Sequence, residues 1–202
     1  MYIMSQDKQR KNAVLVYGRF PEFFEDGIRP LDIPECNPNN KGNWMGWTKE
    51  KLEEKGFEVH CLIVPEVWKA PYGVWKEELD KINIDSETTL VGLSQGAGAI
   101  TRYISEEKKR IKKLILVAPA RKISDTEWLE FYNFEISTDV KKGIEAGTTI
   151  FYDTEDFEDI VKSVEIYRKD LDAMVIEMPN YGHFSFEIRE FPELLEEILE
   201  TY

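Results

Sequence analysis

Six short runs of mostly apolar residues recur along the chain, and they are rich in Val, Ile, Leu and aromatic side chains. Most of them show no regular alternation with polar residues, which is typical of strands that are buried on both faces of a sheet. We predict strands at residues 13–17, 57–64, 89–93, 114–118, 148–152 and within 172–178.

Amphipathic stretches separate these runs. Trp75, Leu79 and Ile82 follow one another at the i, i+4, i+7 spacing of one helical face, which predicts a helix. We predict helices at residues 44–55, 72–82, 95–107, 140–144, 157–164 and 191–199.

Three residues at predicted helix ends fit these limits. Asn43 is a favourable N-cap, and Gly56 is a favourable residue just past a helix end. Pro192 suits the first turn of the last helix, where its missing N–H costs no hydrogen bond.

The order of these elements predicts the architecture. Strands and helices alternate, so we expect an α/β protein in which helices cover both faces of a parallel sheet. No shift in composition marks a linker, and we expect one domain over residues 1–202. Within it we expect a polar tail at 1–12, a loop insertion at 19–43 and a cap-like segment at 120–147. An irregular connection as long as the insertion is usually functional or mobile.

Charge and cysteine content narrow the choice of partners. The net charge of −13 repels nucleic-acid phosphates and anionic lipid surfaces, so we expect neither nucleic acid nor membrane as a partner. No apolar run reaches membrane-spanning length. The two cysteines, Cys36 and Cys61, lack the spacing of a metal site and indicate no disulfide framework. We therefore expect a cytoplasmic protein with no metal site.

One motif carries recognisable chemistry. Gly92, Ser94 and Gly96 form a G-x-S-x-G pattern between a predicted strand and a predicted helix. This context is typical of a nucleophile elbow, in which a tight turn projects the serine hydroxyl out of the sheet. The backbone N–H of Gln95 lies at the start of the helix, where hydrogen-bond donors and the helix dipole favour negative charge.

Partners for Ser94 follow other strands of the predicted sheet, at the edge where parallel sheets bind ligands. His183 follows the last strand, and Asp153 and Asp156 follow the one before it, in the Ser–Asp–His order of α/β-hydrolases. A histidine activates a serine as base, and a carboxylate holds the imidazole in the required tautomer. Spacing alone leaves Asp153 and Asp156 as alternatives. The other histidine, His60, lies within a predicted strand, and we expect it to be structural.

The sequence resembles the small serine hydrolases of the retinoblastoma-binding-protein-9 / YdeN type, a family of the α/β-hydrolase superfamily. The similar segments are the motif at 91–97, the helix with Trp44 and Trp47, the strand that follows it, and Y-G-H-F at 181–184. The resemblance implies a three-layer fold around a six-stranded parallel sheet of order 2-1-3-4-5-6. It also implies hydrolysis of esters or amides.

The resemblance also implies the remaining site residues. Residues 151–157 are similar to the acid-bearing loop of the family, and there Asp156 takes the place of the acid, so we prefer it to Asp153. The turn after the first strand normally supplies the second donor of the oxyanion hole. Our candidate is the Arg19 N–H, with Phe20 as the alternative, because the chain departs here from the family's short turn.

Aromatic residues on the predicted rim loops suggest an apolar substrate pocket. We select Phe20, Trp68 and Trp128 as candidate substrate-binding residues. The alternative is that these side chains pack the rim loops onto the core.

Together these patterns predict a carboxylesterase-like serine hydrolase that needs no cofactor and acts on a small-molecule ester or amide. An alternative is a catalytically weak or inactive α/β-hydrolase-fold protein that binds a protein partner. A flavodoxin-like nucleotide or flavin binder is disfavoured because no glycine-rich phosphate loop follows the first predicted strand.

Overall fold

The fold was obtained as a computed structural model, which describes residues 11–25, 27–33, 36–121, 129–185 and 187–202. The described residues form a six-stranded parallel sheet of order β2-β1-β3-β4-β5-β6. The strands are β1 (Asn12–Val16), β2 (Glu58–Leu62), β3 (Thr88–Leu93), β4 (Lys113–Val117), β5 (Thr148–Tyr152) and β6 (Met174–Glu177). The predicted fold class is confirmed, and the first five predicted strands begin and end within two residues of the observed ones.

The helices lie between the strands. They are η1 (Pro30–Asp32), α1 (Trp44–Glu54), α2 (Tyr72–Asp80), α3 (Gln95–Glu106), α4 (Leu129–Tyr132), α5 (Thr138–Lys142), α6 (Glu158–Leu171) and α7 (Pro192–Leu199). Asn43 caps α1 as predicted, because its side-chain oxygen accepts hydrogen bonds from two backbone N–H groups of the first turn. None of the helices in the described part of the chain is both long and apolar enough to cross a membrane.

Three helix predictions need correction. The short helices η1 and α4 were not predicted, because three or four residues are too few to show a periodic pattern. The apolar residues that predicted α6 were named only as far as Val164, but the helix continues to Leu171. Tyr167 and Leu171 are buried there, so the apolar stripe extends for two more turns.

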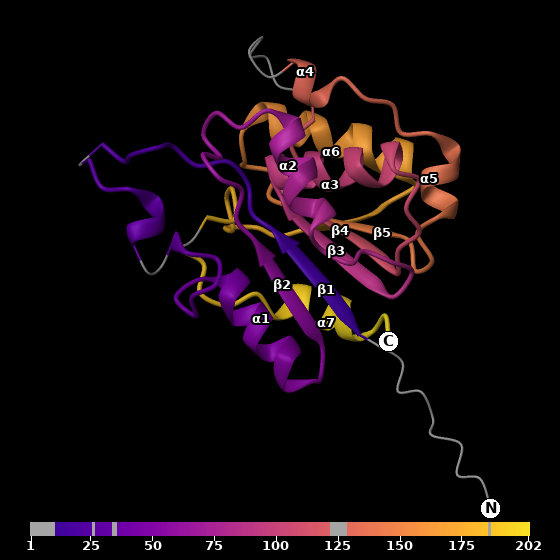
Figure 1. The fold of residues 1–202 in the computed structure, drawn as a ribbon, viewed down its shortest axis with the longest axis horizontal. Helices are drawn as coiled ribbons and strands as arrows, with labels where there is room; N and C mark the ends of the chain where they lie inside the picture. The colour runs from indigo at the N-terminus through magenta and orange to yellow at the C-terminus, as the bar shows by residue number, and fades with distance from the viewer. Residues whose placement is uncertain (1–10, 26, 34–35, 122–128, 186) are drawn as a thin grey trace, which may run out of the picture.

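Two apolar layers hold the sheet between the helices. Along β1, Val14 and Val16 pack on the side of α2, α3 and α6, whereas Ala13 and Leu15 pack on the side of α1 and α7. Figure 1 shows this division, with α1 and α7 on one side of the sheet and α2, α3 and α6 on the other. The alternation follows from the two-residue period of a strand. Because all strands run parallel, the loops after them meet at one edge, where the site lies.

Candidate active site

Ser94 lies in the sharp turn between β3 and α3. Its backbone has φ 52° and ψ −117°, a sparsely populated conformation for a residue with a side chain. Neighbouring backbone groups hold it there: the Ser94 N–H donates to the Val117 oxygen at 2.9 Å, and the Ala120 N–H donates to the Ser94 oxygen at 3.1 Å. The chain therefore maintains a strained serine at the end of a central strand, as the motif predicts.

The two glycines of the motif are required by close approach of the backbone. A Cβ on Gly92 would lie 2.6 Å from the Cα of Ala97, and a Cβ on Gly96 would lie 2.6 Å from the carbonyl oxygens of both Val16 and Tyr17. Real Cβ contacts are essentially never this short. The absence of side chains at these positions lets α3 begin directly against β3 and the end of β1.

His183 and Asp156 complete a hydrogen-bonded chain with Ser94. The Nε2 atom of His183 lies 3.0 Å from Ser94 Oγ, and its Nδ1 atom lies 2.9 Å and 3.0 Å from the two carboxylate oxygens of Asp156. Asp156 follows β5, and its side chain is only 1% exposed, whereas that of His183, which follows β6, is 30% exposed. The tautomer with its proton on Nδ1 satisfies both contacts, since it donates to Asp156 and accepts from Ser94.

Asp153, the alternative acid, makes different contacts. Its carboxylate accepts hydrogen bonds from the backbone N–H of Glu155 at 3.0 Å and of Gly182 at 2.8 Å. These bonds, that from Glu155 first, lower the pKa of Asp153 below its ordinary value. Thus the structure brings Asp156 to the imidazole and uses Asp153 to bind backbone.

The candidate oxyanion residues also lie at this edge. Gln95 begins α3 and is buried. The turn after β1 runs against Ser94: a Cβ on Gly18 would lie 2.9 Å from the Cβ of Ser94. Gly18, Arg19 and Phe20 line the same pocket as Ser94. This placement puts the predicted backbone donors in the neighbourhood of the serine hydroxyl.

A cavity of about 190 Å³ opens beside Ser94. Its lining consists of Tyr17, Gly18, Arg19, Phe20, Pro21, Phe24, Pro30, Cys36, Leu93, Ser94, His183 and Ser185. Half of these residues come from the insertion at 19–43, so this segment forms the wall of the pocket. Sequence reasoning did not select Pro30 or Cys36, because the insertion shows no periodic pattern.

The three candidate substrate-binding aromatic residues have different environments. Phe20 lines the cavity, whereas Trp68 packs against the core on the side of α2 and α3 and is absent from the lining. Trp128 lies outside the described residues. Phe157, which the prediction included in the helix after β5, is 68% exposed, and its ring packs edge-on against the His183 imidazole at 5.3 Å. The sequence signal for this contact was the position of Phe157 directly after Asp156, the preferred candidate acid.

Of the remaining histidine and the two cysteines, only Cys36 lines the cavity beside Ser94. His60 is on the edge strand β2, with Nε2 3.2 Å from Glu58 Oε1. Neither Cys36 nor Cys61 forms a disulfide. Among the described residues, no group of three or more His, Cys, Asp or Glu side chains is arranged to hold a metal ion.

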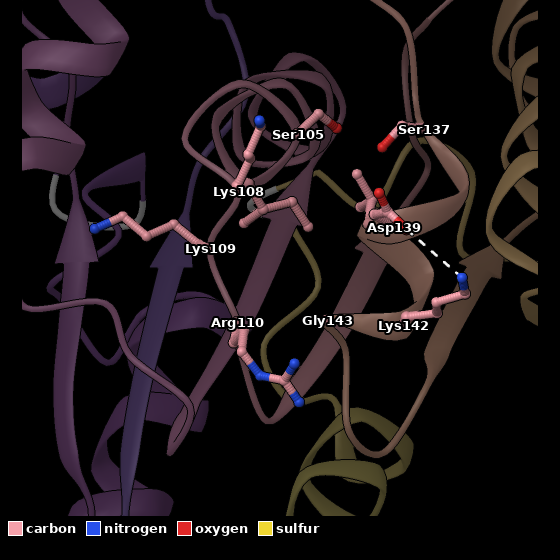
Figure 2. Close-up of a pocket in the computed structure, with 10 residues that line it drawn as sticks. Ser105, Lys108, Lys109, Arg110, Ser137, Asp139, Lys142 and Gly143 are labelled. Carbon is pink, nitrogen blue, oxygen red and sulfur yellow. Dashed lines mark ion pairs between the residues drawn. The ribbon is translucent and has the colours of Figure 1, made fainter.

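A larger hollow, of about 390 Å³, lies between the α3–β4 loop and α5 (Figure 2). Both segments precede strands, so this hollow is at the opposite end of the sheet from Ser94. Figure 2 shows the Lys109 and Arg110 side chains pointing in different directions, and Lys142 is 3.6 Å from Asp139. No histidine lines it. Size alone therefore does not identify the catalytic site.

The parallel sheet with a strained serine turn after β3 defines the class of α/β-hydrolases. Comparison with known proteins agrees with this class and also identifies a family within it. The sequence model of the serine hydrolase family matches residues 33–194, and the chain belongs to this family. A comparison with curated protein sequences found no match.

Solved structures share the fold at low sequence identity. The ydeN gene product from B. subtilis is 16% identical, with a TM-score of 0.75 over 95% of this chain and 98% of that chain. A putative yden-like hydrolase from Pectobacterium atrosepticum is also 16% identical, with a TM-score of 0.65 over 96% of this chain and 91% of that chain. A monoacylglycerol lipase from Paleococcus ferrophilus is 14% identical, with a TM-score of 0.63 over 96% of both chains.

Proposed function

We propose that this serine hydrolase cleaves small carboxylic esters or amides through an acyl-enzyme on Ser94. The observation that carries the proposal is the hydrogen-bonded chain from Ser94 Oγ through His183 to the buried Asp156. A serine hydroxyl is a weak nucleophile until a base removes its proton, and histidine accepts protons near neutral pH.

The reaction follows from these positions. Ser94 Oγ attacks the carbonyl carbon of the substrate while its proton moves to His183 Nε2, and Asp156 stabilises the resulting imidazolium. The N–H groups of Gln95 and Arg19 bind the oxyanion of the tetrahedral intermediate. Each such donor contributes about 3–4 kcal/mol to the stabilisation of the transition state.

Collapse of the intermediate releases the products in two stages. The alcohol or amine leaves with the proton from His183, and the acyl group stays on Ser94. Water then attacks the acyl-enzyme and gives its proton to His183. The carboxylic acid departs, and the hydroxyl of Ser94 takes the proton back. No cofactor takes part in these steps.

The size of the cavity beside Ser94 favours substrates with a small apolar acyl group. An apolar cavity of about 150 Å³ accommodates benzene, so the cavity of about 190 Å³ here suits a group of roughly seven carbon atoms. Phe20, Phe24 and Pro30 would contact this group. A long fatty-acyl chain would have to extend out of the cavity.

A fluorophosphonate probe tests the nucleophile. We expect one label on the wild-type protein and none on the Ser94→Ala variant. Ser105→Ala is the matched control, because Ser105 lies in the hollow at the opposite end of the sheet (Figure 2), and it should retain the label. Absence of labelling in folded wild-type protein would refute the proposal and favour a binding protein with this fold.

A series of p-nitrophenyl esters tests the size of the acyl group. We expect kcat/KM to be highest for acyl groups of about four to eight carbons and to fall for chains of about twelve or more, which exceed the cavity. A maximum at the longest chains would contradict the assignment of the cavity as the acyl pocket while leaving the Ser94 chemistry intact.

A further inference from the structure

Asp153 is a buried acid beside the site that takes no part in the proposed reaction. It is 2% exposed and directly follows β5. Its Oδ1 accepts from the backbone N–H of Glu155, the residue before Asp156. Its Oδ2 accepts from the backbone N–H of Gly182, the residue before His183. A single carboxylate therefore joins the loop of the acid to the loop of the base.

We propose that Asp153 is a positioning residue, which holds the loops after β5 and β6 so that His183 and Asp156 stay in hydrogen-bonding contact. The catalytic consequence rests on the proposed function. The positioning itself is a statement about the two loops and can be tested without turnover.

The loop that carries His183 requires such support. Asn180 and Phe184 have positive φ angles of 70° and 52°, which cost free energy for residues other than glycine and persist only where the surroundings hold them. The Phe184 carbonyl accepts a hydrogen bond of 2.9 Å from the indole N–H of Trp44. His183 thus lies between two anchored neighbours, with Gly182 held by Asp153 and Phe184 held by Trp44.

The charge of Asp153 suits this role. A carboxylate offers acceptors on both oxygens, and hydrogen bonds from N–H groups to a charged acceptor are about twice as strong as those between neutral groups. An asparagine has the same shape but only one acceptor oxygen, so its NH₂ group would face one of the two backbone N–H donors. Asp153→Asn therefore breaks one of the two anchors with little change in volume.

The first experiment measures kinetics. In Asp153→Asn we expect kcat for a short-chain p-nitrophenyl ester to fall about a hundredfold, the effect typical of a displacement of about 1 Å, while KM changes by no more than about twofold. Glu155→Gln is the matched control. Glu155 lies two residues from Asp153, and its side chain is exposed. This substitution also removes one negative charge, but it keeps the backbone N–H that Asp153 binds. An unchanged kcat in Asp153→Asn would overturn the proposal.

The second experiment does not depend on activity. In the Ser94→Ala protein, we expect the His183 Nδ1 proton to give a downfield NMR signal, since it is hydrogen-bonded to Asp156. Adding Asp153→Asn should broaden or remove this signal, and adding Glu155→Gln should keep it. An inactive wild-type protein would refute the proposed function and leave the positioning role standing, whereas an unchanged signal after Asp153→Asn is added to Ser94→Ala would refute the positioning role.

A third measurement uses the wild-type protein, so it tests the proposal even if the Asp153→Asn variant fails to fold. In the wild-type protein, the amides of Glu155 and Gly182 lie in loops, yet both donate to a buried carboxylate. We expect their hydrogen exchange to be slowed well beyond the rate of an exposed loop amide. Unprotected exchange at both amides would overturn the proposal.

Discussion

Substitution of Gly96 tests whether the start of α3 must pack directly against the end of β1. A Cβ at this position would lie 2.6 Å from the carbonyl oxygens of Val16 and Tyr17, whereas ordinary contact begins at 3.4 Å. Neither oxygen can withdraw easily, since β1 is hydrogen-bonded to β2 on one side and to β3 on the other. In Gly96→Ala, α3 must therefore move away from the sheet or the Ser94 turn must distort.

The expected cost follows from this double contact. Extra atoms in a well-packed region cost about 1–3 kcal/mol, occasionally more, and two backbone contacts on one Cβ place Gly96→Ala near 3 kcal/mol. For a chain of this size, 1 kcal/mol lowers the melting temperature by about 2–4 °C. We expect the melting temperature of Gly96→Ala to fall by about 6–12 °C. Activity should also fall, because Gly96 lies two residues from Ser94.

Gly73→Ala provides the matched control. Gly73 lies in α2, has no positive φ, and a Cβ there would meet nothing within 4 Å. Alanine is favoured over glycine in a helix by about 0.5–1 kcal/mol, so this substitution should stabilise the protein. Urea unfolding of both variants measures the two free energies. If Gly96→Ala unfolds within about 0.5 kcal/mol of wild type, the close-packing explanation of the motif is wrong.

Three further predictions concern capping, the acid and pH. Asn43→Ala should lower the free energy of unfolding, measured by urea titration, by about 1–2 kcal/mol, because two N–H groups of α1 lose their acceptor. Ser137→Ala is the control: Ser137 also precedes a helix, but its side chain makes no capping bond, so the same titration should show little effect. Asp156→Asn should lower kcat for a short ester by about 10⁴-fold, and a loss below tenfold would argue against its role. The pKa of Asp153 is lowered by folding, so wild type should be more stable than Asp153→Asn above the ordinary pKa of about 3.9, and this advantage should disappear as pH falls through the folded-state pKa. An advantage that is independent of pH would contradict the lowered pKa.

Sequence reasoning located the elements whose signals are local. The strand β5 was predicted with its observed limits, Thr148–Tyr152, because its apolar run is bounded by Gly147 and Asp153. The Ser94 turn was predicted because G-x-S-x-G reports two close approaches of backbone that only glycine permits. Both signals lie within a few residues of the feature they predict.

The site residues that sequence reasoning left open depend on contacts between distant segments. Asp153 and Asp156 follow the same strand, and from the residues alone either could reach the histidine. Only the turn after β5 determines that Asp156 faces His183, 27 residues along the chain, while Asp153 turns to the backbone. Trp68 was selected for its place in a loop, but it packs against the core.

The amino-acid sequence by itself determined the parallel sheet, the Ser94 turn and the family, because apolar runs, glycine spacing and the order of chemical groups are properties of the chain itself. The tertiary structure decided which acid contacts the imidazole and which residues of the insertion line the pocket. It also decided that Phe157 lies exposed against His183. The physical reason is that side-chain direction at a strand end depends on one or two backbone dihedral angles of the following turn. Those angles are set by packing against segments far away in the sequence.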